Sequence, residues 1–315
     1  MEAAKMMNVT VNGTVHQYPY GTPYRTIAAD FQAKYPHQIL LVNRDGKLRE
    51  LYKTLKRDCT LSMVTGADKP GRQTYERSAI LLMLKAFYDV AGRENVKNVR
   101  VEFSLSNALF CKAYGSFALD ADLLAQVEKR MRALVDQALP IEKRAVDIEE
   151  AMAFLKANGM EDKARLLNYR ISSRVNLYTL DGFTDYFYGY MVPDTGYLRW
   201  FALEPFEDGF ILRLPALENP EQVGPFTPSM KVFRAMHDAE DRSAAMYISN
   251  VAEMDDIVAS GQATQMIDEP LLHGGFSVQD GAHIHHQFTG GQLAGNDNVS
   301  AKPADYKDTA VYGKL

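Results

Sequence analysis

The sequence predicts an α+β protein: a small N-terminal module of short strands, then a larger domain of helices against a mixed, antiparallel-rich sheet. Three observations support this. Turn signals separate short apolar runs in the first 66 residues, helical stripes recur between residues 75 and 159, and strand patterns follow between residues 175 and 214. Helices beside a largely antiparallel sheet are typical of the α+β class. A chain of 315 residues, 46% of them hydrophobic, has room for two or three domains with buried cores.

The N-terminal module shows alternating or continuous apolar runs, which indicate strands, and one helical stripe. Its expected elements are a hairpin over residues 9–15 turning at Asn12-Gly13, a helix after Pro23 with Ile27 and Phe31 on one face, a buried strand over Ile39–Val42, and a turn at residues 43–46.

The larger domain alternates helical and strand patterns. Its expected helices are Tyr75–Ala91, one capped by Asp120, and one capped by Asp147 with Gly159 just past its end. Its expected strands are Val99–Leu105, Val175–Leu180, Phe183–Tyr190, Gly196–Phe201 and Phe210–Leu214. Residues 225–261 are predicted to be loop and helix.

Charge is unevenly distributed along a chain whose net charge is −5. The first 66 residues carry nine Lys or Arg against five Asp or Glu, so the remainder is acidic. Six cations form a candidate phosphate-binding patch: Arg44, Lys47, Arg49, Lys53, Lys56 and Arg57. A solvated face of a small domain explains the same run, and the acidic total disfavours a general nucleic-acid binder.

The two cysteines, Cys59 and Cys111, fit a reducing compartment and free thiols better than a disulfide framework. No apolar run reaches the length of a membrane span, and the N-terminus lacks the apolar core of a signal peptide. These features predict a cytoplasmic protein with no membrane partner.

The order of the N-terminal elements resembles a TGS domain, the ubiquitin-like β-grasp module shared by threonyl-tRNA synthetases, certain GTPases and stringent-response enzymes. The features that match are the Asn12-Gly13 hairpin, the helix after Pro23 and the segment Asp58–Leu61. The resemblance implies a β-grasp fold for residues 1–66.

The segment from Asp185 to Gly196 reads DYFYGYMVPDTG. It resembles the second signature of the editing domain of threonyl- and alanyl-tRNA synthetases, where a Cys-x-x-x-His pair precedes Val-Pro, so that Phe187 and Met191 take the ligand positions. The first signature, His-x-x-x-His on a helix, matches with Arg77 and Leu81. The resemblance implies a degenerate editing-like domain over residues 72–224.

Zinc needs thiolate, imidazole or carboxylate donors. Arginine, leucine and phenylalanine supply none of these, and a methionine thioether is a poor zinc ligand. No histidine occurs between His37 and His237. We therefore expect no metal, no cofactor and no catalytic residue of the editing type in this domain.

One bacterial family joins TGS and degenerate editing domains to a uridine kinase or phosphoribulokinase-type domain, and residues 9–266 resemble the front part of such a nucleoside kinase. Residues 225–266 would be the helical linker into the kinase domain. The kinase requires a loop of the form G-x-x-x-x-G-K-[ST], and the Gly-Lys pairs Gly46-Lys47 and Gly313-Lys314 lack its other residues. We expect the kinase domain to be missing and uridine not to be phosphorylated.

The resemblance places a candidate ligand cleft at the vestigial editing positions. Tyrosine rings can stack on a base, and a guanidinium can hold a phosphate or carboxylate, although packing within strands explains the aromatic residues equally well. The residues of this cleft are Arg77, Leu81, Phe187, Met191, Tyr188, Tyr190 and Arg199.

The leading hypothesis is a non-catalytic pseudo-enzyme: the nucleotide- or RNA-binding, regulatory N-terminal region of a uridine-kinase-like protein. Its expected partners are a nucleotide or RNA, with a kinase domain or a second copy of the chain as alternatives. Two other functions stay open. One is an aminoacyl-tRNA deacylase with a non-metal site at Arg77, Asp185 and Asp194, and the other is an interaction or oligomerisation scaffold.

Residues 267–315 hold seven glycines and four histidines and show no periodic apolar pattern, which predicts a flexible tail. The histidines, His273, His283, His285 and His286, allow a metal site only as a minor alternative.

Overall fold

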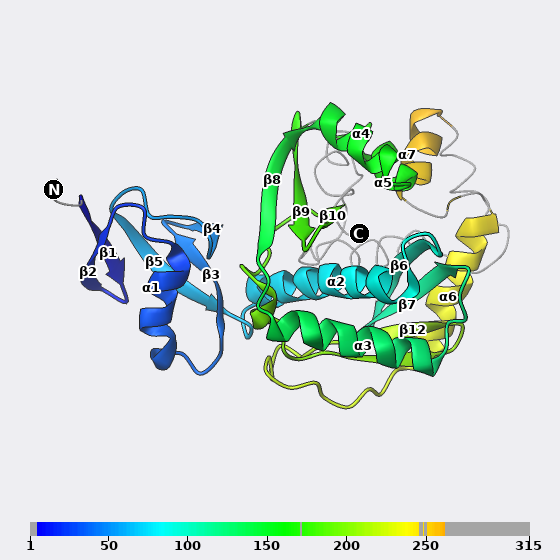
Figure 1. Cartoon of the computed structure of the whole chain (residues 1–315), viewed down its shortest axis with the longest axis horizontal. Helices are drawn as coiled ribbons and strands as arrows, with labels where there is room; N and C mark the ends of the chain where they lie inside the picture. The colour runs from blue at the N-terminus through cyan, green and yellow to red at the C-terminus, as the bar shows by residue number, and fades with distance from the viewer. Residues whose placement is uncertain (1–4, 171, 246–247, 249–250, 262–315) are drawn as a thin grey trace, which may run out of the picture. The chain divides into compact units, whose positions relative to one another are not determined.

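Five strands form the first sheet, in the order β2-β1-β5-β3-β4 (Figure 1). The β1–β5 pair is parallel and the other pairs are antiparallel. The strands are β1 (Met6–Val11), β2 (Thr14–Pro19), β3 (Ile39–Arg44), β4 (Lys47–Glu50) and β5 (Cys59–Thr65), with helix α1 (Tyr24–Phe31) and the short 3₁₀ helix η1 (Gln32–Lys34) between β2 and β3. A helix against a mixed sheet of this kind confirms the expected β-grasp module.

Local sequence explains the turns of this module. Asn12 and Gly13 both have positive φ angles, 50° and 80°, as the two-residue turn of a twisted hairpin requires. Asp45 and Gly46 repeat this geometry between β3 and β4. Helix α1 buries its apolar face, including Ile27, in the module core.

The structure, a computed structural model, describes residues 5–170, 172–245, 248 and 251–261. It divides into two compact units. The first contains Met1–Val99, Lys112–Arg144 and Tyr178–Phe226, and the second contains Arg100–Cys111, Ala145–Leu177 and the residues from Thr227 onward. The predicted tail and its four histidines lie outside the described residues.

Two long helices, α2 (Lys69–Ala91) and α3 (Ala121–Asp136), pack side by side in the first unit (Figure 1). Helix α2 begins six residues before the predicted start at Tyr75, because Pro70 is tolerated in a first helical turn. At its start a Cβ on Gly71 would lie 1.8 Å from the Thr65 carbonyl oxygen, so only glycine fits there. Asp120 caps α3 as predicted, accepting a hydrogen bond from the Leu123 amide at 2.8 Å.

Two further sheets complete the fold, with orders β10-β9-β8 and β11-β12-β7-β6. Their strands are β6 (Val96–Leu105), β7 (Ala108–Gly115), β8 (Ile141–Asp147), β9 (Arg174–Leu180), β10 (Phe183–Tyr186), β11 (Ala202–Phe206) and β12 (Gly209–Arg213). Strand β10 ends at Tyr186, four residues before the predicted end at Tyr190. The backbone that follows it is bound by side chains instead: Tyr178 and Lys143 donate to the Gly189 carbonyl, and Glu50 accepts from the Met191 amide.

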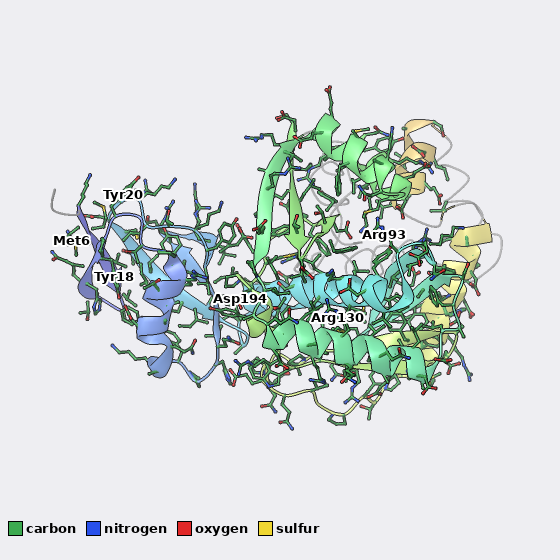
Figure 2. The ribbon with its side chains drawn as sticks, in the orientation of Figure 1. Met6, Tyr18, Tyr20, Arg93, Arg130 and Asp194 are labelled. Atoms are coloured by element: carbon green, nitrogen blue, oxygen red, sulfur yellow. The ribbon has the colours of Figure 1, made fainter. Side chains whose placement is uncertain are left out.

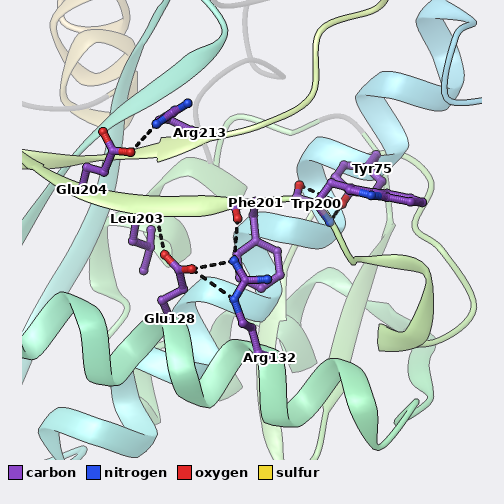
Figure 3. A network of polar contacts seen from close by, with 8 residues as sticks. All are labelled: Tyr75, Glu128, Arg132, Trp200, Phe201, Leu203, Glu204 and Arg213. Atoms are coloured by element: carbon purple, nitrogen blue, oxygen red, sulfur yellow. Dashed lines mark hydrogen bonds and ion pairs between the residues drawn. The ribbon is translucent and has the colours of Figure 1, made fainter. Parts of the chain in front are cut away.

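The predicted strand Gly196–Phe201 is wrong. Residues Thr195–Tyr197 form the 3₁₀ helix η2, and the next strand begins at Ala202. Side chains bind the intervening backbone (Figure 3): the Tyr75 hydroxyl donates to the Trp200 carbonyl at 2.9 Å and accepts from the Trp200 amide at 2.8 Å, and Arg132 donates to the Phe201 carbonyl at 3.0 Å. These bonds satisfy backbone groups that a strand would pair with a neighbour.

The second unit contains the helices α4 (Ile148–Ala157), α5 (Glu161–Leu167), α6 (Met230–Ala245) and α7 (Val251–Ala259). Helices α6 and α7 lie in the region predicted to be loop and helix. Phe233 of α6 is buried and its ring lies 5.9 and 5.2 Å from the rings of Phe103 and Phe110. Helix α5 packs on α7, where Arg165 and Tyr169 both bind Asp256.

Among the described residues, every helix is too short or too polar to cross a membrane.

Candidate functional site

Arg77 lies on α2, one residue before the buried Ser78, and packs against Gly189 in the segment after β10. A Cβ on Gly189 would lie 2.7 Å from the Arg77 guanidinium carbon, and the φ angle of Gly189 is +115°, a region that L side chains rarely adopt. The glycine therefore allows the guanidinium to approach the backbone closely.

The two segments that resemble the editing signatures lie together. Besides the Arg77–Gly189 contact, the Ser78 hydroxyl accepts a hydrogen bond from the Val192 amide at 3.0 Å. Three of the four vestigial ligand positions are buried in this region: Leu81 is fully buried, and Phe187 and Met191 are each 1% exposed. Only Arg77 presents a polar group.

Arg77 has no hydrogen bond or ion pair within the part of the chain that the structure describes, although it is half-buried. Burial lowers the pKa of its guanidinium, and the electrostatic influence of Glu76, Tyr178, Tyr188 and Tyr190 opposes that shift. Tyr178 is buried and Tyr188 is 43% exposed. We call Arg77, Gly189 and these three tyrosines the Arg77 site. It is a half-buried cation close to phenol groups.

Glu50, at the end of β4, is the hub of a buried network next to this site. The residue is 1% exposed. Its Oε1 accepts from the Tyr178 hydroxyl at 2.8 Å and from the Met191 amide at 3.2 Å. Its Oε2 accepts from Lys143 Nζ and from the Tyr52 hydroxyl, both at 3.0 Å. A buried carboxylate with four donors is well compensated.

Lys143, on β8, supplies the second cation near the site. Its Nζ lies 5.0 Å from the centre of the Tyr178 ring and 5.8 Å from that of Tyr190, distances at which a cation is attracted to a ring face. Burial lowers the pKa of its ammonium group, whereas Glu50 raises it. Tyr178 and Tyr190 are thus in reach of both Lys143 and Arg77.

Arg199 differs from the other predicted cleft residues. It is exposed, and its Nε donates to the Gly196 carbonyl at 3.1 Å. It is not among the groups that shift the pKa of Arg77. The structure therefore groups Arg77 with Tyr188 and Tyr190 but not with Arg199.

The carboxylates of the non-metal deacylase hypothesis have structural roles. Asp194 (Figure 2) accepts from the Gly196 amide at 3.0 Å at the start of η2, and burial raises the pKa of its carboxyl. Asp185 is buried and accepts from the Tyr186 amide. Neither is among the groups that shift the pKa of Arg77.

The basic patch is partly neutralised within its own module. Arg57 pairs with Asp45 at 3.4 Å, and Arg44 donates to the Tyr24 hydroxyl at 3.2 Å. Arg49 donates to a neighbouring backbone carbonyl, and Lys53 lies over the Tyr52 ring. Lys47 and Lys56 are exposed. Exposed lysines can meet phosphates, but they form no shaped site.

A small pocket lies elsewhere in the first unit, and none of the seven predicted cleft residues lines it. Its lining includes Arg72 and Tyr75 of α2 together with Trp200 and Pro220. The Arg77 site is therefore not part of this pocket. Within the described residues, no three His, Cys, Asp or Glu side chains gather as metal ligands.

Sequence reasoning missed three members of this region: Glu50, Glu76 and Lys143. Glu50 and Lys143 come from strands that are distant in sequence, and only the folded chain brings them together. The sequence did point to Glu76, because this residue adjoins Arg77 at the first signature. Burial raises the pKa of its carboxyl, and the neighbouring Arg72 and Arg77 oppose that shift.

The Glu76 pKa predicts a pH-dependent stability. A pKa raised from the ordinary 4.5 means that the fold favours the neutral acid, so this stabilisation is present below that value and lost as pH rises through the folded-state pKa. Glu76→Gln stays neutral and should unfold at a higher temperature than the parent at about pH 7. The difference should shrink as pH falls through the carboxyl range. Thermal melts across this range, with the exposed Glu142→Gln as control, measure it; a pH-independent difference would contradict the shift.

Comparison with known proteins finds similarity to threonine–tRNA ligases. The chain is 29% identical over 210 residues to the threonine–tRNA ligase of Symbiobacterium thermophilum, a match that covers 64% of the chain and 31% of the relative. It is 28% identical over 202 residues to that of Halalkalibacterium halodurans (64% and 31%) and 28% identical over 193 residues to that of Burkholderia lata (61% and 30%). No protein-family model matches the chain.

The chain spans less than a third of the length of these curated relatives. Their similarity agrees with TGS-like and editing-like modules of the threonyl-tRNA synthetase kind. It gives no support to a uridine-kinase parent.

Proposed function

We propose that the chain binds the acceptor end of a tRNA, or a nucleotide that resembles it, at the Arg77 site. One observation carries this proposal: Arg77 is half-buried and has neither a hydrogen bond nor an ion pair within the described residues. A half-buried guanidinium that bonds no protein group keeps its donors available for a ligand. A phosphate or carboxylate would supply the missing hydrogen bonds.

The surroundings of Arg77 favour a nucleotide over a simple anion. Tyr188 is exposed enough to stack on a base, and base stacking on an aromatic ring contributes about 1–3 kcal/mol. Lys143 Nζ lies 5.8 Å from the centre of the Tyr190 ring, with its charge balanced by Glu50. Exposed lysines of the basic patch would add a salt-dependent attraction to the RNA backbone.

The relatives support RNA as the ligand class, since they are named as threonine–tRNA ligases. We therefore propose a tRNA-related role in place of the regulatory half of a uridine kinase. We also propose a TGS domain over residues 1–66 and an editing-like domain over residues 72–224. A cytoplasmic location and a second copy of the chain as a partner are further parts of the proposal.

Arg77→Ala is expected to weaken binding of an RNA microhelix with a 3′ CCA end by about 1–3 kcal/mol, the range for charge-assisted hydrogen bonds. Calorimetry at fixed salt concentration measures the loss. Arg77→Lys should recover only part of it, because an ammonium cannot form the paired bonds of a guanidinium.

Arg199→Ala is the matched control for this test. It removes an exposed arginine that is not among the groups acting on Arg77, so the affinity should barely change. Equal affinity of the parent and Arg77→Ala, or loss only in Arg199→Ala, would overturn the proposal.

A second candidate function is hydrolysis of an aminoacyl ester, and Glu76 is the observation that favours it. A carboxyl whose pKa is raised by burial suits a general base. In that reaction Glu76 takes a proton from water, the oxygen attacks the ester carbonyl, and the departing ribose oxygen receives the proton. Release of amino acid from an aminoacylated microhelix, lost in Glu76→Gln, would support it; release no faster than without protein would exclude it.

A further inference from the structure

We infer that Glu50, on the β-grasp strand β4, is a positioning residue for the Arg77 site. Glu50 does not belong to either signature segment, and both of its carboxylate oxygens accept hydrogen bonds. Its network fixes the place of the Gly189 backbone, on which the Arg77 guanidinium rests. The β-grasp sheet thereby contributes to the site that we propose for the acceptor end.

Two side chains that bind Glu50, Tyr178 and Lys143, also bind the Gly189 carbonyl. The Tyr178 hydroxyl lies 2.6 Å from the Gly189 carbonyl oxygen and 2.8 Å from Glu50 Oε1. Lys143 Nζ lies 3.4 Å from the same carbonyl and 3.0 Å from Glu50 Oε2. The Met191 amide, two residues on, donates directly to Glu50.

The charge of Glu50 matters most to this arrangement, because it balances that of Lys143. The Tyr178 phenol has a single hydrogen for two acceptors, whereas the Lys143 ammonium has three hydrogens. Without the carboxylate charge, Lys143 would lack its counter-charge, and the Met191 amide would have a neutral oxygen in place of a charged acceptor. Both changes loosen the segment that contains Gly189.

Arg77 depends on that segment because it has no hydrogen bond of its own within the described residues. Packing against Gly189 is therefore what sets the position of its guanidinium. A displaced Gly189 leaves the guanidinium free to turn toward solvent. The effect of Glu50 on a ligand at Arg77 is indirect, through two intervening residues: Tyr178 or Lys143, and then Gly189.

The same strand carries Lys47 and Arg49 of the basic patch. Glu50 therefore connects the strand that would meet RNA phosphates to the site that would meet the 3′ end. The connection runs entirely through residues of the first unit.

Labelling with phenylglyoxal, an arginine reagent, tests the inference without any ligand. Glu50→Gln keeps the side-chain shape but removes the charge, and Tyr178→Phe removes one hydroxyl. Both should raise the rate of modification at Arg77, Glu50→Gln by about tenfold, the factor that corresponds to ~1.4 kcal/mol. Peptide mass spectrometry reads the rate at each arginine. Arg132, which pairs with Glu128 on α3, is the internal reference and should not change.

Leu55→Ala is the control for a purely structural effect. Leu55 is a fully buried core residue of the same β-grasp module, so its loss destabilises the module without touching the Glu50 network. Faster labelling of Arg77 in Leu55→Ala as well, or an unchanged rate in both Glu50→Gln and Tyr178→Phe, would overturn the inference.

A double-mutant cycle with the CCA microhelix extends the test, and this arm alone rests on the proposed function. Glu50→Gln should weaken binding about tenfold in the parent, and should have no further effect when Arg77 is already alanine. Equal losses in both backgrounds would contradict a role through Arg77. If the parent binds no RNA, the proposed function fails, while the labelling result still decides the role of Glu50.

Discussion

Replacing Lys143 with methionine is expected to lower the free energy of unfolding by about 3 kcal/mol, near the lower end of the cost of breaking a buried ion pair. The carboxylate of Glu50 is 2% exposed and would keep only neutral donors: two tyrosine hydroxyls and the Met191 amide. Urea denaturation, checked for two-state behaviour, measures the change.

Lys112→Met is the matched control for this prediction. Lys112 is as buried as Lys143, at 12% exposure, and its distance to Asp208 is also 3.0 Å, but Asp208 is 51% exposed. A solvated carboxylate tolerates the loss, so this variant should lose no more than about 1 kcal/mol. Similar losses in the two variants would show that burial of Glu50 does not decide the energy.

Gly189→Ala is expected to reduce the affinity for the CCA microhelix by about tenfold, as if Arg77 were absent. The new methyl group would lie 2.7 Å from the guanidinium carbon, and the flexible arginine side chain is the part that yields. The positive φ angle adds a strain of about 1–3 kcal/mol. Calorimetry gives the affinity, and thermal unfolding gives the stability.

Gly182→Ala separates these two effects. Gly182 also has a positive φ angle, +77°, but a Cβ there meets no atom within 4 Å. It should lose a comparable amount of stability and bind RNA like the parent. Loss of RNA binding in both variants would mean that backbone strain, and not displacement of Arg77, is responsible.

The parts of the fold that short-range chemistry controls could be predicted from the sequence. Asn12 and Gly13 adopt positive φ angles because the hairpin twist requires them, and Asp120 caps α3 because its oxygen reaches the Leu123 amide. Such features depend on neighbours within a few residues. The β-grasp module follows from several of them in order.

The structure of the segment Gly196–Phe201 could not be predicted from its local sequence. Its aromatic residues are typical of a strand, but Tyr75 and Arg132, from two distant helices, bind its backbone (Figure 3). Tertiary hydrogen bonds override a local preference of this kind. No pattern within the segment reveals them.

The candidate site divides in the same way. Resemblance to a known signature pointed to Arg77 and to the segment from Phe187 to Met191, which the structure brings together. Glu50 and Lys143 are invisible in the sequence, because their importance comes from burial and from partners more than forty residues away.

Photo-crosslinking from the 3′ terminus of the RNA is the most direct test of binding at the Arg77 site. A CCA microhelix with a photoreactive 3′-terminal base would be irradiated with the protein, and the modified residues identified by peptide mass spectrometry. Binding at the Arg77 site predicts crosslinks to Tyr188 or Tyr190 that disappear in Arg77→Ala. Crosslinks confined to the basic patch, or unchanged in Arg77→Ala, would contradict it.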